Sequence, residues 1–108
     1  MQELGESIHD DLHEAAITMW AHIRKLNEFD VSSGDGRRGF ILLIQDPSHR
    51  KLLNDLEPRK SELPVLMKMT IDKELEVLKS IDSSTDAALA RRGLRRWREG
   101  DPKFEDAD

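Results

Sequence analysis

The longest helical signal in the sequence is LGESIHDDLHEAAITMWAHIRKL, residues 4–26. Its apolar side chains recur at steps of three and four residues, which is the period of an α-helix and differs from the alternation of a strand. Acidic residues gather in its first half, where the helix dipole favours negative charge. The pattern predicts one long amphipathic helix that begins near Gly5 or Ser7 and ends near Phe29.

The next segment has two parts of opposite character. Residues 30–39 contain three glycines and two serines, and this composition predicts a flexible loop. The apolar run 40–45 fits either a buried strand or a buried helical segment. Because the sequence has no second strand candidate to pair with this run, a short helix is the preferred interpretation.

Three more helices are predicted from capping residues and apolar period. The first covers residues 46–57 and starts with an acidic cap followed by a proline in the first turn. The second is long, is capped by Ser61 and covers residues 61–81. The third covers residues 85–99, with Gly100 as its C-terminal cap.

Together these elements predict an all-α protein, a small bundle of four to five helices of which two are long. Residues 1–100 are expected to form one helical domain and residues 101–108 an acidic disordered tail. A chain of 108 residues buries only a thin core. Apolar side chains also lie outside the main stripe of the second long helix, and they include Val65, Met69 and Leu75. We therefore expect a homodimer in which a second copy covers part of this surface.

The composition excludes several classes of protein. The sequence has no cysteine, which excludes a disulfide scaffold and a cysteine zinc site and indicates an intracellular, cytoplasmic protein. The longest wholly apolar run, residues 40–44, is far shorter than the roughly 20 residues that a membrane-spanning helix needs. The acidic start of the chain is also unlike a signal peptide.

The sharpest charge feature is Arg91-Arg92-Gly93-Leu94-Arg95-Arg96-Trp97-Arg98. On a helix the arginines fan across one side, opposite the apolar residues. Such a helix could dock on an acidic protein surface, either the first helix of this chain or a partner. The alternative is a nucleic-acid-binding regulator whose arginines contact phosphates. The net charge of −5 favours the protein surface, so we expect partner binding by Arg91, Arg92, Arg95, Arg96, Trp97 and Arg98.

Two polar residues fall on apolar helix faces. His22 lies within the apolar stripe of the first helix, and Glu74 lies in the middle of the apolar face of the second long helix. A buried carboxylate needs a partner, so Glu74 is predicted to face His22 or an arginine of the last helix, within the chain or across the dimer. Because no nucleophile lies nearby, we interpret the two residues as a buried structural pair and not as an acid–base catalyst.

Two weaker motifs carry no prediction of a site. Residues 34–39 match the letters of the dinucleotide-binding fingerprint, but they follow a helix where that motif follows a strand. His9 and His13 lie one turn apart beside Glu6, but no second set of ligands completes a helical metal site. We expect no metal, no cofactor and no enzymatic activity. We expect the protein to be a regulator, adaptor or inhibitor that acts by binding another protein.

Overall fold

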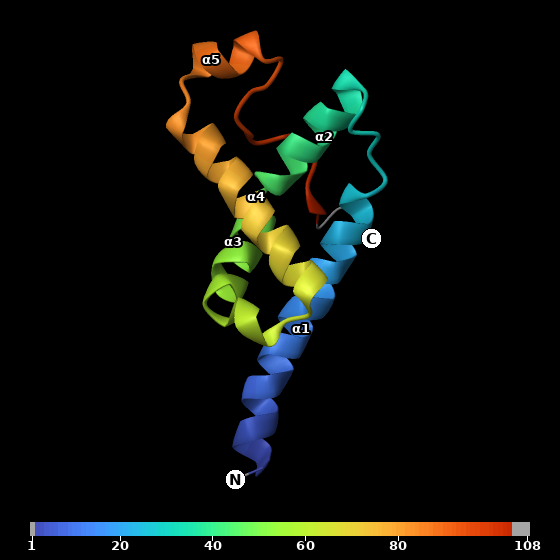
Figure 1. Cartoon of the computed structure of the whole chain (residues 1–108), viewed down its shortest axis with the longest axis vertical. Coiled ribbons are helices and arrows are strands. Elements are labelled where there is room, and N and C mark those ends of the chain that lie inside the picture. The colour runs from blue at the N-terminus through green and yellow to red at the C-terminus, as the bar shows by residue number, and fades with distance from the viewer. Residues whose placement is uncertain (1, 105–108) are drawn as a thin grey trace.

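The computed structural model describes residues 2–104, and the side chains of residues 11–104. The described residues form helices and no strand, which confirms the all-α prediction (Figure 1). No helix among them is both long enough and apolar enough to cross a membrane. The elements in chain order are α1 (Gln2–Leu26), α2 (Gly34–Ile44), α3 (Pro47–Leu56), the 3-10 helix η1 (Glu57–Glu62), α4 (Val65–Ser83) and α5 (Asp86–Arg91).

The core lies where the C-terminal half of α1 meets α2, α3 and α4. Figure 1 shows the N-terminal half of α1 extending past all the other elements, and the molecule measures 55 × 29 × 26 Å. The buried apolar side chains come from all four long helices and from the C-terminal segment, and include Met19, Leu26, Leu43, Ile44, Leu53, Leu56, Ile71, Leu78 and Phe104.

The start of α3 agrees with its predicted cap. The side chain of Asp46 accepts hydrogen bonds from the backbone N–H groups of Ser48 (3.0 Å) and His49 (3.3 Å), and Pro47 occupies the first turn. The apolar run 40–45 is helical, as preferred, because it forms the second half of α2 and its C-terminal cap. The next start differs from prediction: α4 begins at Val65, and Ser61 does not cap it. A residue before proline is pushed out of the helical region, and Leu63 is accordingly extended (φ −96°, ψ 160°).

The predicted loop 30–39 is wrong over its second half, because α2 begins at Gly34. Ser33 caps this helix: its hydroxyl accepts the backbone N–H of Gly36 at 3.0 Å. Gly36 is needed for close packing, since a Cβ there would lie 1.9 Å from the carbonyl oxygen of Asp30. This glycine therefore lets the turn after α1 fold tightly against α2, and it does not make the segment flexible.

The predicted last helix is also too long, because α5 ends at Arg91 and not at Glu99. Gly93 has a left-handed backbone (φ 73°), and its N–H donates to Ala90 O at 3.0 Å. The N–H of Leu94 donates to Leu89 O at 2.8 Å. These two bonds form a Schellman motif, so Gly93 and not Gly100 caps the helix.

Residues 92–104, which we call the C-terminal strap, contain no further α-helix and return from α5 towards α1 (Figure 1). Residues 101–104 were predicted to belong to a disordered tail, but they are part of the fold, because Phe104 is buried. The rest of that predicted tail, residues 105–108, lies outside the described residues.

We expect Gly36→Ala to lower the free energy of unfolding by about 1–3 kcal/mol, because the added methyl group meets backbone that cannot move aside cheaply. Gly34→Ala is the matched control: no heavy atom lies within 4 Å of the new Cβ, and alanine favours the helix. Urea unfolding of both variants measures the difference. Equal stabilities would contradict the packing role of Gly36.

Candidate functional site

Three buried polar side chains form a hydrogen-bonded chain across three helices. Nδ1 of His22 on α1 lies 2.8 Å from Nδ1 of His49 on α3, and Nε2 of His49 lies 2.6 Å from Oε1 of Glu74 on α4. His22 is 9% exposed, His49 0% and Glu74 4%. The structure therefore brings His22 and Glu74 into one cluster. The two side chains are linked by the hydrogen bonds that each makes with His49.

His49 was missed in the sequence, although its position carried a signal. His49, Leu52, Leu53 and Leu56 are spaced at i, i+3, i+4 and i+7, which places all four on one face of α3. That face is buried, and the histidine occupies it as an apolar residue would. A buried histidine on such a stripe needs polar partners, and His22 and Glu74 supply them.

Burial controls the charge state of His22. It lowers the pKa of this imidazole from 6.5 to about 4, and electrostatic interactions with His49 and Lys25 act in the same direction. The carboxylate of Asp46 opposes this shift. His22 is therefore neutral at physiological pH and carries one ring proton.

Phe104 of the C-terminal strap covers the two imidazole rings. Its ring stacks on His22 with a centroid distance of 3.8 Å and an interplanar angle of 13°, and on His49 at 5.0 Å and 26°. Phe104 is itself buried. The last described residue of the chain thus closes one side of the histidine cluster.

Gln45, at the end of α2, fastens the strap to the body of the protein. Its side-chain oxygen accepts the backbone N–H of Trp97 at 3.0 Å, and its side-chain nitrogen donates to the carbonyl oxygens of Arg95 (3.2 Å) and Ile41 (3.1 Å). Gln45 is buried. Asp101 adds a second attachment inside the strap by accepting two hydrogen bonds from the guanidinium of Arg95, at 2.6 and 2.7 Å.

The predicted arginine-rich helix face does not form. Arg95 is bound to Asp101, and Arg96 bonds Asp86 and the carbonyl oxygen of Ser84. The indole N–H of Trp97 donates to Pro102 O at 3.2 Å. The three remaining arginines of the predicted set are exposed, and these are Arg91, Arg92 and Arg98.

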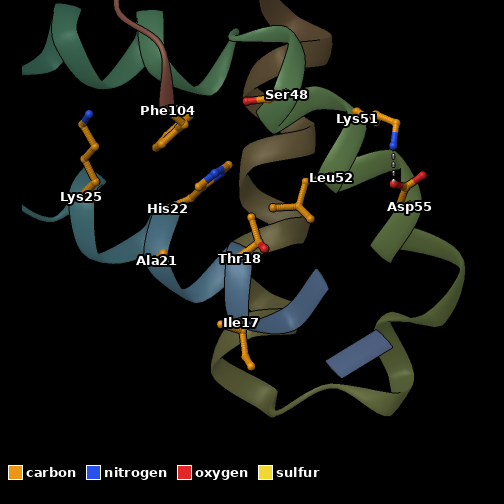
Figure 2. Close-up of a pocket in the computed structure, with 10 residues that line it drawn as sticks. All are labelled: Ile17, Thr18, Ala21, His22, Lys25, Ser48, Lys51, Leu52, Asp55 and Phe104. Carbon is orange, nitrogen blue, oxygen red and sulfur yellow. Dashed lines mark ion pairs between the residues drawn. The ribbon is translucent and has the colours of Figure 1, made fainter. Parts of the chain in front are cut away.

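A cavity of about 540 Å³ opens beside the histidine cluster (Figure 2). It lies between α1, α3 and the strap, and His22 and Phe104 both line it. Figure 2 shows Lys25 on one rim and the ion pair Lys51–Asp55 on the other. The cavity therefore combines an apolar interior with charged groups at its edge, and its remaining lining residues are Ile17, Thr18, Ala21, Ser48 and Leu52.

A second surface feature is apolar and exposed. Four large side chains, between 47% and 70% exposed, lie around a groove of about 520 Å³ between α1 and the start of α4. We call this surface the α1/α4 face and define it by Ile17, Trp20, Val65 and Leu66. Val65 was expected from the sequence to need cover, and in the single chain nothing described covers it.

The weaker motifs are located as follows. Residues 34–39 form the first turns of α2, so they do not follow a strand as the dinucleotide motif requires. The side chains of Glu6 and His9 lie outside the described residues, and His13 borders the groove of the α1/α4 face. Among the side chains of residues 11–104, no group of three or more histidine or acidic residues is placed to hold a metal ion.

We expect the stability of the fold to fall as the pH is lowered from about 6.5 to about 4. Folding lowers the pKa of His22 across this range, so the unfolded chain binds more protons than the folded chain. One such group changes the free energy of unfolding by at most about 1.4 kcal/mol per pH unit. Urea unfolding at several pH values should give a shallower pH dependence for His22→Gln than for the natural chain. Identical slopes for the two proteins would exclude His22 as the cause.

Comparison of the chain with protein-family models, with curated proteins and with solved structures found no match. Function is therefore inferred from the geometry of two features. One is the histidine cluster with its cavity, and the other is the exposed α1/α4 face.

Proposed function

We propose that this protein acts by protein–protein interaction, without catalysing a reaction, and that the α1/α4 face is its main contact surface. The observation that carries the proposal is the exposure of Ile17, Trp20, Val65 and Leu66 around one groove. Contiguous apolar surface of this kind typically marks an interaction site. Covering it releases water and is worth about 25 cal/mol for each Å² of apolar area buried. A cytoplasmic location accords with the cysteine-free sequence.

We propose a second copy of this chain as the occupant of the face. The charges on α1 are divided along its length: residues 2–14 contain acidic side chains and no lysine or arginine, whereas residues 15–26 contain Arg24 and Lys25 and no acid. If the two-fold axis is perpendicular to α1, the two copies of the helix run antiparallel, so the acidic half of each lies beside the basic half of the other. The pattern is therefore self-complementary.

The shape of the molecule supports the same occupant. The N-terminal half of α1 extends past the other elements, and no other described helix lies beside its first turns (Figure 1). The sequence of that half continues the apolar stripe with Leu4, Ile8 and Leu12. An amphipathic helix is stabilised mainly by packing of its apolar face. A second copy would supply packing for the first turns of α1, whose apolar stripe is in line with the buried Met19 and Leu26 and lies on another side of the helix than Ile17 and Trp20.

We expect the natural chain to sediment as a dimer and Leu66→Glu to sediment as a monomer, because a buried charge at the centre of the face is costly. Val31→Glu is the matched control, since Val31 is also a large exposed apolar residue but is not part of the face. Sedimentation across a dilution series measures both variants, and circular dichroism checks that they are folded. A natural chain that stays monomeric at high concentration would contradict the proposed contact.

The exposed arginines offer a second contact for an external partner. Arg91, Arg92 and Arg98 have no ion-pair partner within the described part of the chain, and they lie at the end of α5 and in the strap. Guanidinium groups pair well with carboxylates, so we propose an acidic protein surface as the partner. Nucleic acid is the alternative, and the loss of Arg95 and Arg96 to internal contacts reduces the arginines available to phosphates.

We expect poly-glutamate to bind the natural chain and to bind the triple variant Arg91→Gln, Arg92→Gln, Arg98→Gln much more weakly. The control replaces three exposed lysines of α4, Lys68, Lys73 and Lys79, by glutamine, which changes the net charge equally. Fluorescence anisotropy at near-physiological salt measures both. If duplex DNA binds more tightly than poly-glutamate under these conditions, the nucleic-acid alternative replaces the protein partner.

A further inference from the structure

We propose that the cavity between α1, α3 and the C-terminal strap binds a small carboxylic acid, with its carboxylate at His22 and Lys25 and its apolar body against Leu52 and Phe104 (Figure 2). This binding site is independent of the protein contacts proposed above. Its volume of about 540 Å³ falls within the roughly 300–1,000 Å³ of cavities that hold small molecules.

The first support is a buried side chain with an unused polar atom. His22 is nine-tenths buried and uses Nδ1 to bond His49, but its Nε2 makes no hydrogen bond to any residue described. Every fully enclosed side-chain nitrogen and oxygen in the described part of the chain does have a partner. Nε2 must therefore reach open space, and His22 lines this cavity. A ligand atom placed there would complete the hydrogen bonding of the ring.

The second support is the hydrogen-bonded chain behind that atom. The two facing Nδ1 atoms share one proton, so the protonation of His49 sets the role of Nε2 in His22. When His49 is neutral with its proton towards Glu74, His22 donates from Nδ1 and its Nε2 is a bare acceptor. When His49 takes up a second proton, it donates to His22, whose own proton then sits on Nε2. The buried carboxylate of Glu74 balances the added charge.

A bound carboxylate favours the second of these states. It accepts the Nε2–H of His22, so binding draws one proton into the chain formed by Glu74, His49 and His22. The charged groups facing His22 are Lys25 on α1, His49 on α3 and Asp46 at the cap of α3, with Glu74 on α4 behind His49. Two carboxylates oppose an incoming anion: Asp46 accepts hydrogen bonds from the start of α3, and Asp55 on the opposite rim is paired with Lys51.

The third support is the position of Lys25. It follows His22 by three residues, so both side chains lie on the same face of α1 and line the same cavity. Lys25 has no ion pair with any described residue, whereas Lys51 on the opposite rim lies 3.5 Å from Asp55. A ligand carboxylate would give Lys25 its counter-ion. The apolar side chains of Ile17, Ala21, Leu52 and Phe104 would surround the rest of the ligand.

Benzoate is a suitable probe, and benzamide is its neutral match in shape. We expect titration of the full chain with benzoate, followed by ¹H–¹⁵N NMR, to shift signals of residues lining the cavity with a dissociation constant of about 1 mM or tighter. The ring signals of His22 should show the proton on Nε2 in the complex. Benzamide should bind about tenfold more weakly, because it is neutral and cannot form an ion pair with Lys25.

Two variants test the named residues. Lys25→Gln removes the counter-ion at the cavity rim and should weaken benzoate binding about tenfold, while Lys68→Gln on the exposed side of α4 should leave it unchanged. Glu74 acts only through His49, so its test is the position of the ring proton of His22. In the benzoate complex, Glu74→Gln should no longer place that proton on Nε2, because no carboxylate then balances the proton taken up by His49. If Glu74→Gln does not fold, Lys25→Gln and its control still test the site.

Three results would each overturn the proposal. One is the absence of benzoate-induced shifts at residues that line the cavity. Another is binding of benzamide as tight as that of benzoate, which would show an apolar hole without anion recognition. The last is an unchanged benzoate affinity in Lys25→Gln. None of these results bears on the oligomeric state, so a failure here is distinct from a failure of the proposed protein contact.

Discussion

The fold depends on the need to satisfy one buried carboxylate. Glu74 lies in the middle of the apolar face of α4, where an unpaired charge would be strongly unfavourable, and its partner in the fold is His49. His49 in turn needs a partner for Nδ1, and His22 provides it. The hydrogen-bonded chain therefore fixes α1, α3 and α4 relative to one another, since a shift of any of these helices would break a short hydrogen bond between buried groups.

The C-terminal strap extends this polar framework to the end of the described chain. Gln45 satisfies three backbone groups with one buried amide, and two of them belong to the strap. The strap then delivers Phe104 onto the two imidazole rings. Arginine and tryptophan side chains that would form an interaction surface on a helix are used here to hold this irregular segment in place. The basic C-terminal segment is thus in part structural.

Besides the exposed arginines, two features remain for function once these internal contacts are counted. The α1/α4 face exposes large apolar side chains, and Nε2 of His22 beside the cavity has no hydrogen-bond partner among the described residues. Ile17 borders both, so the two features are neighbours on α1. A partner packed on the face would lie against one wall of the cavity.

Local sequence determined the parts of the structure that depend on neighbours along one helix. The period of the apolar residues predicted α1 and α4. The start of α3 was marked by Asp46 and Pro47. The helical wheel put His22 and Glu74 on helix faces that the fold buries. Tertiary structure decided which groups meet across the chain. The choice between Gly93 and Gly100 as the end of α5 depends on contacts such as that of Gln45 with Trp97. The choice between loop and helix for residues 34–39 depends on contacts such as that of Gly36 with Asp30. His49 likewise became the link between His22 and Glu74 only when three helices packed together, because helical periodicity records which side of a helix is buried and contains no information about what lies against it.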